Sequence, residues 1–178
     1  VLIRGGSILS KGRVGSLTAT LPLGLAYLAG YLRKHNYSVH LIDALSEDPM
    51  RLSSCEWGEI AGLSNEEVLN KITWNPKIIG FSCMFSNDWI YLKKLISKTK
   101  KKFPNVITVM GGEHASALAE YVLNYCEELD FVIRGEGEHS LLEFAEYHIK
   151  NSGEINEIPG LVYRKGNEVI VNDYVRIK

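Results

Sequence analysis

The chain has 178 residues, of which 46% are hydrophobic and 23% are charged, and its formal net charge at pH 7 is −1. This length and composition suit one globular domain with a real core and a small extension. The near-zero net charge argues against a nucleic-acid-binding protein, because such proteins usually carry a basic surplus as well as a basic patch.

Cysteine content and hydropathy bear on the compartment of the protein. Its three cysteines, Cys55, Cys83 and Cys126, are too few and too far apart for a zinc or iron–sulfur motif, and their odd number does not suggest a disulfide framework. The most apolar segment, residues 17–32, is interrupted by proline and glycine and is shorter than the roughly 20 residues of a membrane span. Because the chain begins at Val1 with no charged-then-apolar leader, we expect an excised part of a longer cytoplasmic protein, without a signal peptide and with no membrane partner.

The first third of the chain is predicted to alternate short regular elements with long loops. Val1–Arg4 reads as a strand, and Gly5–Thr20 as a Gly- and Ser-rich loop of a length that is often functional. Pro22 then opens a leucine repeat at helical spacing, which ends near Asn36. Ser38–Asp43 is the second predicted strand, and residues 44–63 are expected to be irregular and to fold partly over the binding crevice or contact a further domain.

The remaining residues repeat a strand followed by a helix. A capping box at Ser64 and Glu67 opens one helix. The other predicted elements are strands Ile78–Ser82, Val106–Met110 and Phe131–Ile133, helices Trp89–Phe103, Ala115–Tyr125 and His139–Ile149, and a hairpin of Gly160–Arg164 with Glu168–Val171. This alternation predicts an α/β fold: a flavodoxin-like (Rossmann-like) three-layer sandwich with a five-stranded parallel sheet in the order 2-1-3-4-5, plus the C-terminal β-hairpin. We assign residues 1–155 to this domain and residues 156–178 to the hairpin extension.

Small residues follow three of the predicted strands and mark a binding edge. They are Ser82, the pair Gly111 and Gly112, and the run Gly135 to Gly137. Ligands of parallel sheets bind outside the carboxyl ends of the strands, and glycine lets backbone N–H groups approach a flat or phosphate-bearing ligand closely. The chain has no P-loop, no G-x-G-x-x-G after a strand, no G-x-S-x-G elbow and no metal-spaced histidine cluster. The sequence therefore does not favour a P-loop nucleotidase, a dinucleotide-binding enzyme, a serine hydrolase or a histidine-bound metal centre.

The ordered set of these segments resembles the amino-terminal cobalamin-binding domain of cobalamin-dependent radical S-adenosylmethionine enzymes. The resemblance rests on residues 22–32, 39–43, 79–82, 110–114, 130–138 and 158–163. It implies a flavodoxin-like fold with the nucleotide tail of cobalamin beside the sheet and its dimethylbenzimidazole off the cobalt. Ser82 matches the serine after the third strand of that family, and Gly111 and Gly112 match its tail-binding glycine pair.

Two family motifs are missing from this chain. Many cobalamin domains carry D-x-H-x-x-G after the first strand, whose histidine ligates cobalt, but residues 5–20 contain no histidine. The C-x-x-x-C-x-x-C motif of the 4Fe-4S cluster is also absent. The resemblance therefore implies a cobalamin-binding module without a histidine ligand, for a parent enzyme that also uses S-adenosylmethionine and a 4Fe-4S cluster in a methyl transfer or rearrangement, with its catalytic domain beyond residue 178.

The candidate site contains cofactor-binding residues, with no catalytic residue and no metal ligand. The candidates are Leu21, Pro22, Ser82, Cys83, Met84, Phe85, Gly111, Gly112, His114, Gly135, Glu136 and Gly137. We expect Gly112→Val to abolish cobalamin binding and to leave the fold largely intact. A flavodoxin-like module that binds flavin or a nucleotide, and a protein-interaction domain without a cofactor, stay open as alternatives.

Overall fold

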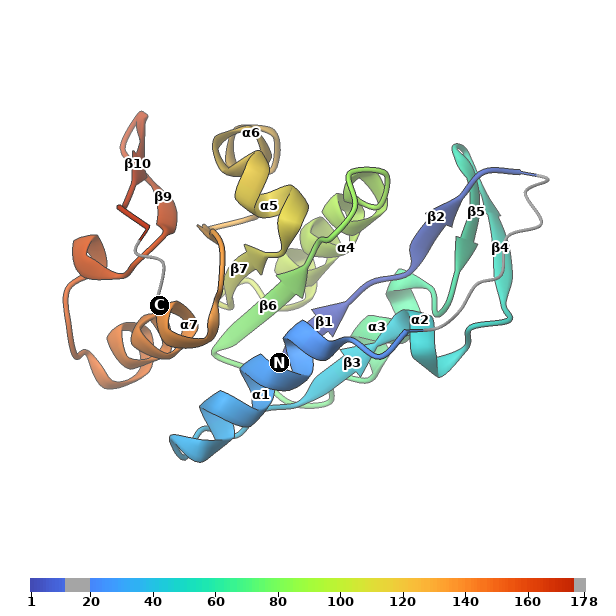
Figure 1. The fold of residues 1–178 in the computed structure, drawn as a ribbon. Coiled ribbons are helices and arrows are strands. Elements are labelled where there is room, and N and C mark those ends of the chain that lie inside the picture. The colour runs from blue at the N-terminus through green and yellow to red at the C-terminus, as the bar shows by residue number, and fades with distance from the viewer. Residues whose placement is uncertain (12–19, 175–178) are drawn as a thin grey trace.

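The structure is a computed structural model that describes residues 1–11 and 20–174 (Figure 1). The strands are β1 (Leu2–Arg4), β2 (Ser7–Leu9), β3 (Leu41–Asp43), β4 (Leu52–Cys55), β5 (Gly58–Ala61), β6 (Ile78–Ser82), β7 (Ile107–Gly111), β8 (Phe131–Ile133), β9 (Leu161–Lys165) and β10 (Glu168–Val171). The helices are α1 (Leu23–Lys34), α2 (Ala44–Glu47), α3 (Asn65–Asn70), α4 (Trp89–Lys102), α5 (Glu113–Ala117), α6 (Ala119–Tyr125) and α7 (Glu138–Ala145).

The main sheet has seven strands in the order β10-β9-β8-β7-β6-β1-β3. Five strands of this sheet, β3, β1, β6, β7 and β8, pair in parallel. The hairpin of β9 and β10 continues the sheet because β9 pairs antiparallel with β8. The predicted α/β fold class is confirmed. The hairpin is part of the same sheet, so the sheet is wider than the five predicted strands.

Helices cover both faces of the main sheet and make three layers. Helices α1 and α7 pack on one face, where their leucines meet Leu2, Val109 and Ile133. Helices α3 to α6 cover the other face, on which Ile3 and Met110 are fully buried. Neighbouring residues of one strand therefore face opposite layers, as the two-residue period of a strand requires. Among the described residues, no helix is both long and apolar enough to cross a membrane.

A second, three-stranded antiparallel sheet in the order β2-β5-β4 corrects two expectations. Residues 44–63 are not irregular, since they hold α2, β4 and β5, and part of the predicted loop after β1 is strand β2. Residues 12–19 of that loop lie outside the described residues. Strand β2 pairs with β5 in the register of Ser7 with Ala61, so two segments far apart in sequence complete each other. Figure 1 shows this small sheet projecting beyond the carboxyl ends of the main strands.

Several predicted element boundaries are confirmed and others shift. The capping box holds, since Ser64 Oγ accepts from Glu67 N at 3.3 Å and Ser64 N donates to Glu67 Oε2 at 2.9 Å. Asn36 takes the left-handed conformation after α1, with φ of 66°. The helix predicted over 115–125 is instead two short helices, because Leu118, with φ of −128°, leaves the helical region. The strand predicted over 38–43 is confined to residues 41–43. The helix predicted over 139–149 is α7, which continues directly into a π-helix over Glu146–Lys150.

Candidate functional site

Two adjacent cavities open at the carboxyl ends of the parallel strands. The first, here called the sheet cavity, has a volume of about 270 Å³ and lies between α1, α7 and the face of β6, β7 and β8. The second, the loop cavity, has a volume of about 560 Å³ and lies between the loop after β1 and the loop after β6. The two share Gly24, Leu25, Ser82 and Met84 in their walls. They lie beside β1 and β6, where the order of the strands in the sheet reverses. Open α/β sheets bind their ligands at such a point.

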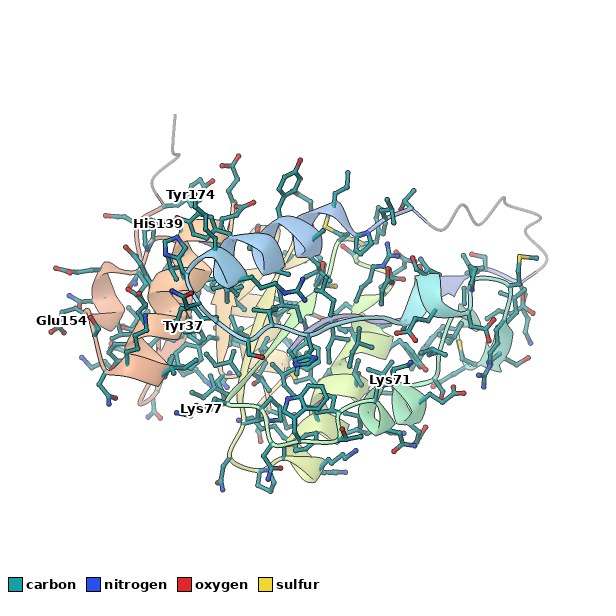
Figure 2. The ribbon with its side chains drawn as sticks, turned by 90° about the horizontal axis from the view of Figure 1, so that it is seen from below. Tyr37, Lys71, Lys77, His139, Glu154 and Tyr174 are labelled. Atoms are coloured by element: carbon teal, nitrogen blue, oxygen red, sulfur yellow. The ribbon has the colours of Figure 1, made fainter. Side chains whose placement is uncertain are left out.

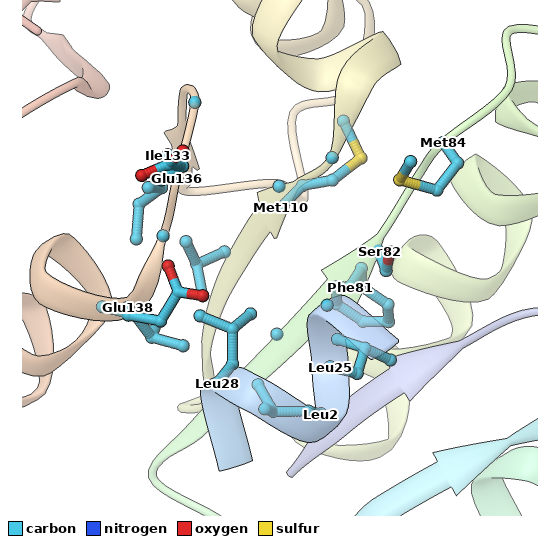
Figure 3. Close-up of a pocket in the computed structure, with 18 of the residues that line it drawn as sticks. Leu2, Leu25, Leu28, Phe81, Ser82, Met84, Met110, Ile133, Glu136 and Glu138 are labelled. Atoms are coloured by element: carbon cyan, nitrogen blue, oxygen red, sulfur yellow. The ribbon is translucent and has the colours of Figure 1, made fainter. Parts of the chain in front are cut away.

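The sheet cavity exists because small residues occupy one face of two neighbouring strands (Figure 3). Gly80 and Ser82 of β6 and Gly111 of β7 share the α1 side of the sheet with Val109, because alternate residues of a strand face the same layer. Ser82 and Gly111 stand directly opposite each other in the register. Large side chains at these positions would fill the space under α1, so the gap is built into the sequence.

The walls of the sheet cavity are apolar inside and acidic at the edge. Leu2, Leu25, Leu28, Val109, Ile133 and Leu141 form the apolar part. The charged residues in the wall are Glu113, Glu136 and Glu138, and no lysine, arginine or histidine is among the described lining residues. Two of these carboxylates, those of Glu136 and Glu138, lie on the same side of the opening in Figure 3. The interior therefore suits a neutral apolar ring and disfavours a phosphate-rich group.

The two glycines at the end of β7 differ in what an added side chain would meet. Gly112 has φ of 102°, and a Cβ on it would lie 2.5 Å from the carbonyl oxygen of Cys83. The geometry argues against the expectation that Gly112→Val leaves the fold largely intact, since the side chain would collide with backbone of the neighbouring loop and force a strained conformation. Gly111 has an ordinary φ, and a Cβ there would meet only the Ile133 carbonyl oxygen, at 3.6 Å. Of the two glycines, Gly111 is the one whose missing side chain leaves room in the cavity.

Exposed apolar side chains surround the mouth of the loop cavity. Leu21 is 75% exposed, Phe85 is 65% exposed and Met84 is 48% exposed. All three line the loop cavity, together with Pro22. A cluster of large apolar side chains at the mouth of a cavity marks a binding surface for a flat apolar ligand or a partner.

Two partly buried polar groups hold the loops of this cavity. The Arg4 guanidinium forms two 2.6 Å bonds with the Asp43 carboxylate and donates to the carbonyl oxygen of Thr20 at 2.9 Å. The carboxylate of Asp88 accepts from Ile8 N at 2.8 Å and from the Ser7 hydroxyl at 3.0 Å. Burial raises the pKa of Asp88, and these two bonds partly offset the effect. The ends of β1, β2, β3 and the loop after β6 are thereby fixed to one another.

Two of the candidate residues do not reach either cavity. The Cys83 side chain is 1% exposed and packs into the core below the sheet, where burial raises the pKa of its thiol to about 12. His114 is 5% exposed, with Nδ1 at 2.9 Å from Ser86 Oγ and its ring 5.7 Å from that of Trp89. Burial lowers the pKa of His114, so it is held neutral. His114 braces the loop after β6 against the turn after β7.

The remaining candidates lie where the sequence places them, and the structure adds others. Ser82, Met84, Gly111, Gly112, Gly135, Glu136 and Gly137 all line the sheet cavity. Sequence reasoning missed its α1 wall, formed by Gly24, Leu25 and Leu28, and missed Gly80. Gly80 could have been found, because Gly80 and Ser82 are small residues two positions apart within an apolar strand.

This fold and site define a flavodoxin-like α/β domain with an apolar ligand cavity at the point where the strand order reverses. The family model described as the B12 binding domain matches residues 16–145 of the chain. The chain therefore belongs to the B12-binding domain family, and its ligand is cobalamin. This membership does not favour the alternatives of a flavin- or nucleotide-binding module or a domain without a cofactor.

The relatives of the chain are longer enzymes. Cytidylyl-2-hydroxyethylphosphonate methyltransferase from Streptomyces wedmorensis is 29% identical over 149 residues, which is 82% of this chain and 28% of the relative. An uncharacterized methyltransferase from Pyrococcus horikoshii is 32% identical over 149 residues, 83% of this chain and 29% of the relative. Among solved structures, the cobalamin-dependent S-adenosylmethionine radical enzyme OxsB, with aqua-cobalamin and S-adenosylmethionine bound, matches with a TM-score of 0.72 at 20% identity, covering 99% of this chain and 22% of that chain. The chain thus spans under a third of the length of these relatives.

Proposed function

We propose that this domain holds cobalamin with its nucleotide tail in the sheet cavity and its corrin ring over the apolar mouth of the loop cavity. The observation that carries the proposal is the face of small residues, Gly80, Ser82 and Gly111, which opens a cavity beneath α1 in a chain of the B12-binding family. Met84 and Ser82 line both cavities, so they stand where the tail would pass from one to the other.

The size and chemistry of the sheet cavity fit the benzimidazole end of the tail. At about 270 Å³ it falls just below the roughly 300–1,000 Å³ of a pocket for a whole drug-sized ligand, so it would take the tail and leave the corrin outside. The leucines and Val109 would bury the neutral base. The tail phosphate would lie away from the carboxylates of Glu136 and Glu138 at the edge of the cavity, since like charges repel.

We further propose that cobalamin binds with its base displaced and with no imidazole on cobalt. Residues 5–20 contain no histidine, and none of the described residues lining the two cavities is a histidine. The apolar side chains of Leu21, Met84 and Phe85 would instead exclude water from the corrin face they cover. The bound group itself would supply methyl-transfer or redox chemistry, and the domain would supply position and environment.

We also propose that the parent protein is a cytoplasmic radical S-adenosylmethionine enzyme that transfers a methyl group or rearranges its substrate. Its catalytic domain would follow residues 156–178 and carry the 4Fe-4S cluster. Two relatives are methyltransferases by name, and the similar OxsB structure is of a cobalamin-dependent S-adenosylmethionine radical enzyme. The three cysteines are all free, which suits a reducing compartment and leaves the cluster ligands to another part of the protein.

Visible and paramagnetic spectra test this proposal. The chain is titrated with hydroxocobalamin, reduced to the cob(II)alamin form and examined for nitrogen superhyperfine splitting. We expect binding with a base-off spectrum and no splitting from an axial nitrogen. Absence of binding would refute the assignment of the cofactor, whereas splitting from an axial imidazole would refute the absence of a histidine ligand.

A further inference from the structure

Tyr174 lies against the loop that forms one wall of the sheet cavity. This loop, Arg134–Gly137, joins β8 to α7. The backbone N–H of Glu136 donates to the Tyr174 hydroxyl at 3.3 Å, and the Tyr174 ring covers Gly135 so closely that a Cβ on that glycine would have no room. The side chain of Tyr174 is labelled in Figure 2, as is that of His139 near the start of α7.

The backbone next to Tyr174 is fixed mainly by the sheet extension, and the Arg134 guanidinium of the loop adds a bond of 3.4 Å to the carbonyl oxygen of Asn172. Gly160 N donates to the carbonyl oxygen of Asp173 at 2.9 Å, and Asn172 N donates to that of Leu161 at 2.9 Å. The Asn172 side chain, 7% exposed, donates to the carbonyl oxygens of Ile155 and Ile158 at 2.8 and 2.9 Å. Hydrogen bonds of the two preceding residues therefore hold the Tyr174 backbone in place next to the loop.

The loop has little else to hold its shape. Gly135 sits at φ of 73°, and both Gly135 and Glu136 are exposed on the loop surface. Besides the contact with Tyr174, the loop is held by a bond from Gly135 N to Ser116 Oγ at 2.8 Å and by two bonds of Arg134: its backbone N–H donates to the Gly160 carbonyl oxygen at 3.0 Å, and its guanidinium donates to the Asn172 carbonyl oxygen at 3.4 Å. Its other side, at Gly135, Glu136 and Gly137, lines the sheet cavity.

We propose that Tyr174 is a positioning residue for cobalamin, which it never touches. It holds the loop in the conformation that forms the cavity wall, and this inference rests on the proposed placement of the nucleotide tail. Because coupling between two binding events is reciprocal, a bound tail must in turn strengthen the contact of Tyr174 with the loop. Occupancy of the cavity is thereby linked to the contact between Tyr174 and the loop.

Two variants of Tyr174 and one control test the inference in the 178-residue chain. Tyr174→Phe keeps the ring and removes the hydroxyl, and Tyr174→Ala removes both; Tyr125→Ala removes a tyrosine that is 59% exposed at the end of α6 and lines neither cavity. We expect hydroxocobalamin affinity to fall roughly threefold in the first, roughly tenfold in the second and not at all in the control. Amide exchange at Gly135 and Glu136, measured without ligand, is expected to accelerate in Tyr174→Ala and not in the control.

The outcomes separate this inference from the function on which it rests. If the parent chain fails to bind hydroxocobalamin, the proposed function is wrong and the inference falls with it. If the parent binds and Tyr174→Ala binds equally well, the function stands and the inference alone is refuted. A lower melting temperature in Tyr174→Ala with parental affinity below the melting range also refutes it, because Tyr174 would then be only structural.

Discussion

The two adjacent glycines at the end of β7 allow a direct test of where the ligand lies, because a side chain added to Gly111 would enter the cavity and one added to Gly112 would meet backbone. At Gly111 an added side chain has an ordinary φ and one neighbour, the Ile133 carbonyl oxygen at 3.6 Å, so Gly111→Val should fold normally. The valine methyl groups would intrude into a cavity of about 270 Å³. Overpacking a well-filled space costs about 1–3 kcal/mol, which corresponds to an affinity loss of about 5- to 150-fold.

The matched variant Gly112→Val should behave in the opposite way. Its Cβ would lie 2.5 Å from the Cys83 carbonyl oxygen, at a backbone φ of 102° that disfavours every side chain. Such strain costs about 1–3 kcal/mol before the collision is counted. For a domain of this size, the strain alone lowers the melting temperature by about 2–12 °C.

Hydroxocobalamin titration and thermal melting of both variants and the parent decide between these expectations. Gly111→Val should melt within a few degrees of the parent and bind weakly, whereas Gly112→Val should melt early. If Gly111→Val melts normally and binds with parental affinity, the tail does not occupy the sheet cavity. If Gly112→Val is as stable as the parent, our reading of the turn is wrong.

Two further predictions concern the brace at His114 and the small sheet. Burial lowers the pKa of His114 below its usual 6.5, so the unfolded chain gains a proton there that the folded chain resists, and stability should fall as the pH drops below about 6.5. Burial also lowers the pKa of His148, so His114→Gln should reduce, without abolishing, the dependence of the melting temperature on pH between about pH 7.5 and pH 5. Parallel curves of melting temperature against pH for variant and parent would contradict this. In the small sheet, residues 52–61 should exchange amide hydrogen more slowly when cobalamin is bound, because β5 pairs with β2 beside the loop cavity. Unchanged exchange, both with cobalamin and in the full-length protein, would make this segment a surface insertion only.

The parallel strands were predictable because each is a short β-branched or apolar run bounded by turn residues. Residues 78–82 and 107–111 are buried on both faces, and that produces a continuous apolar run in the sequence. The small sheet gave no comparable signal. Strand β4 is largely exposed, and its partner β5 pairs with a strand some fifty residues earlier, so neither alternation nor proximity in the sequence reveals the pairing.

The site was predictable at its loops and less so at its walls. Glycines after strands are visible in the sequence, but the orientation of a single side chain depends on packing that the sequence does not display. His114 shows this, since it follows the glycine pair by two positions and yet turns toward Ser86 and Trp89. The α1 wall was missed for a similar reason, because Leu25 and Leu28 look like ordinary core residues of an amphipathic helix.

The closure of the β8–α7 loop by the far end of the chain has a consequence for synthesis on the ribosome. Leu2, at one wall of the cavity, is made well before Gly160 and Tyr174, which hold the loop of another wall. Chains emerge N-terminus first at about 5–20 residues per second, and until β9 emerges β8 has an unpaired edge. A nascent chain stalled before residue 160 would therefore carry an incomplete pocket, and the vitamin must be loaded after the domain has left the exit tunnel.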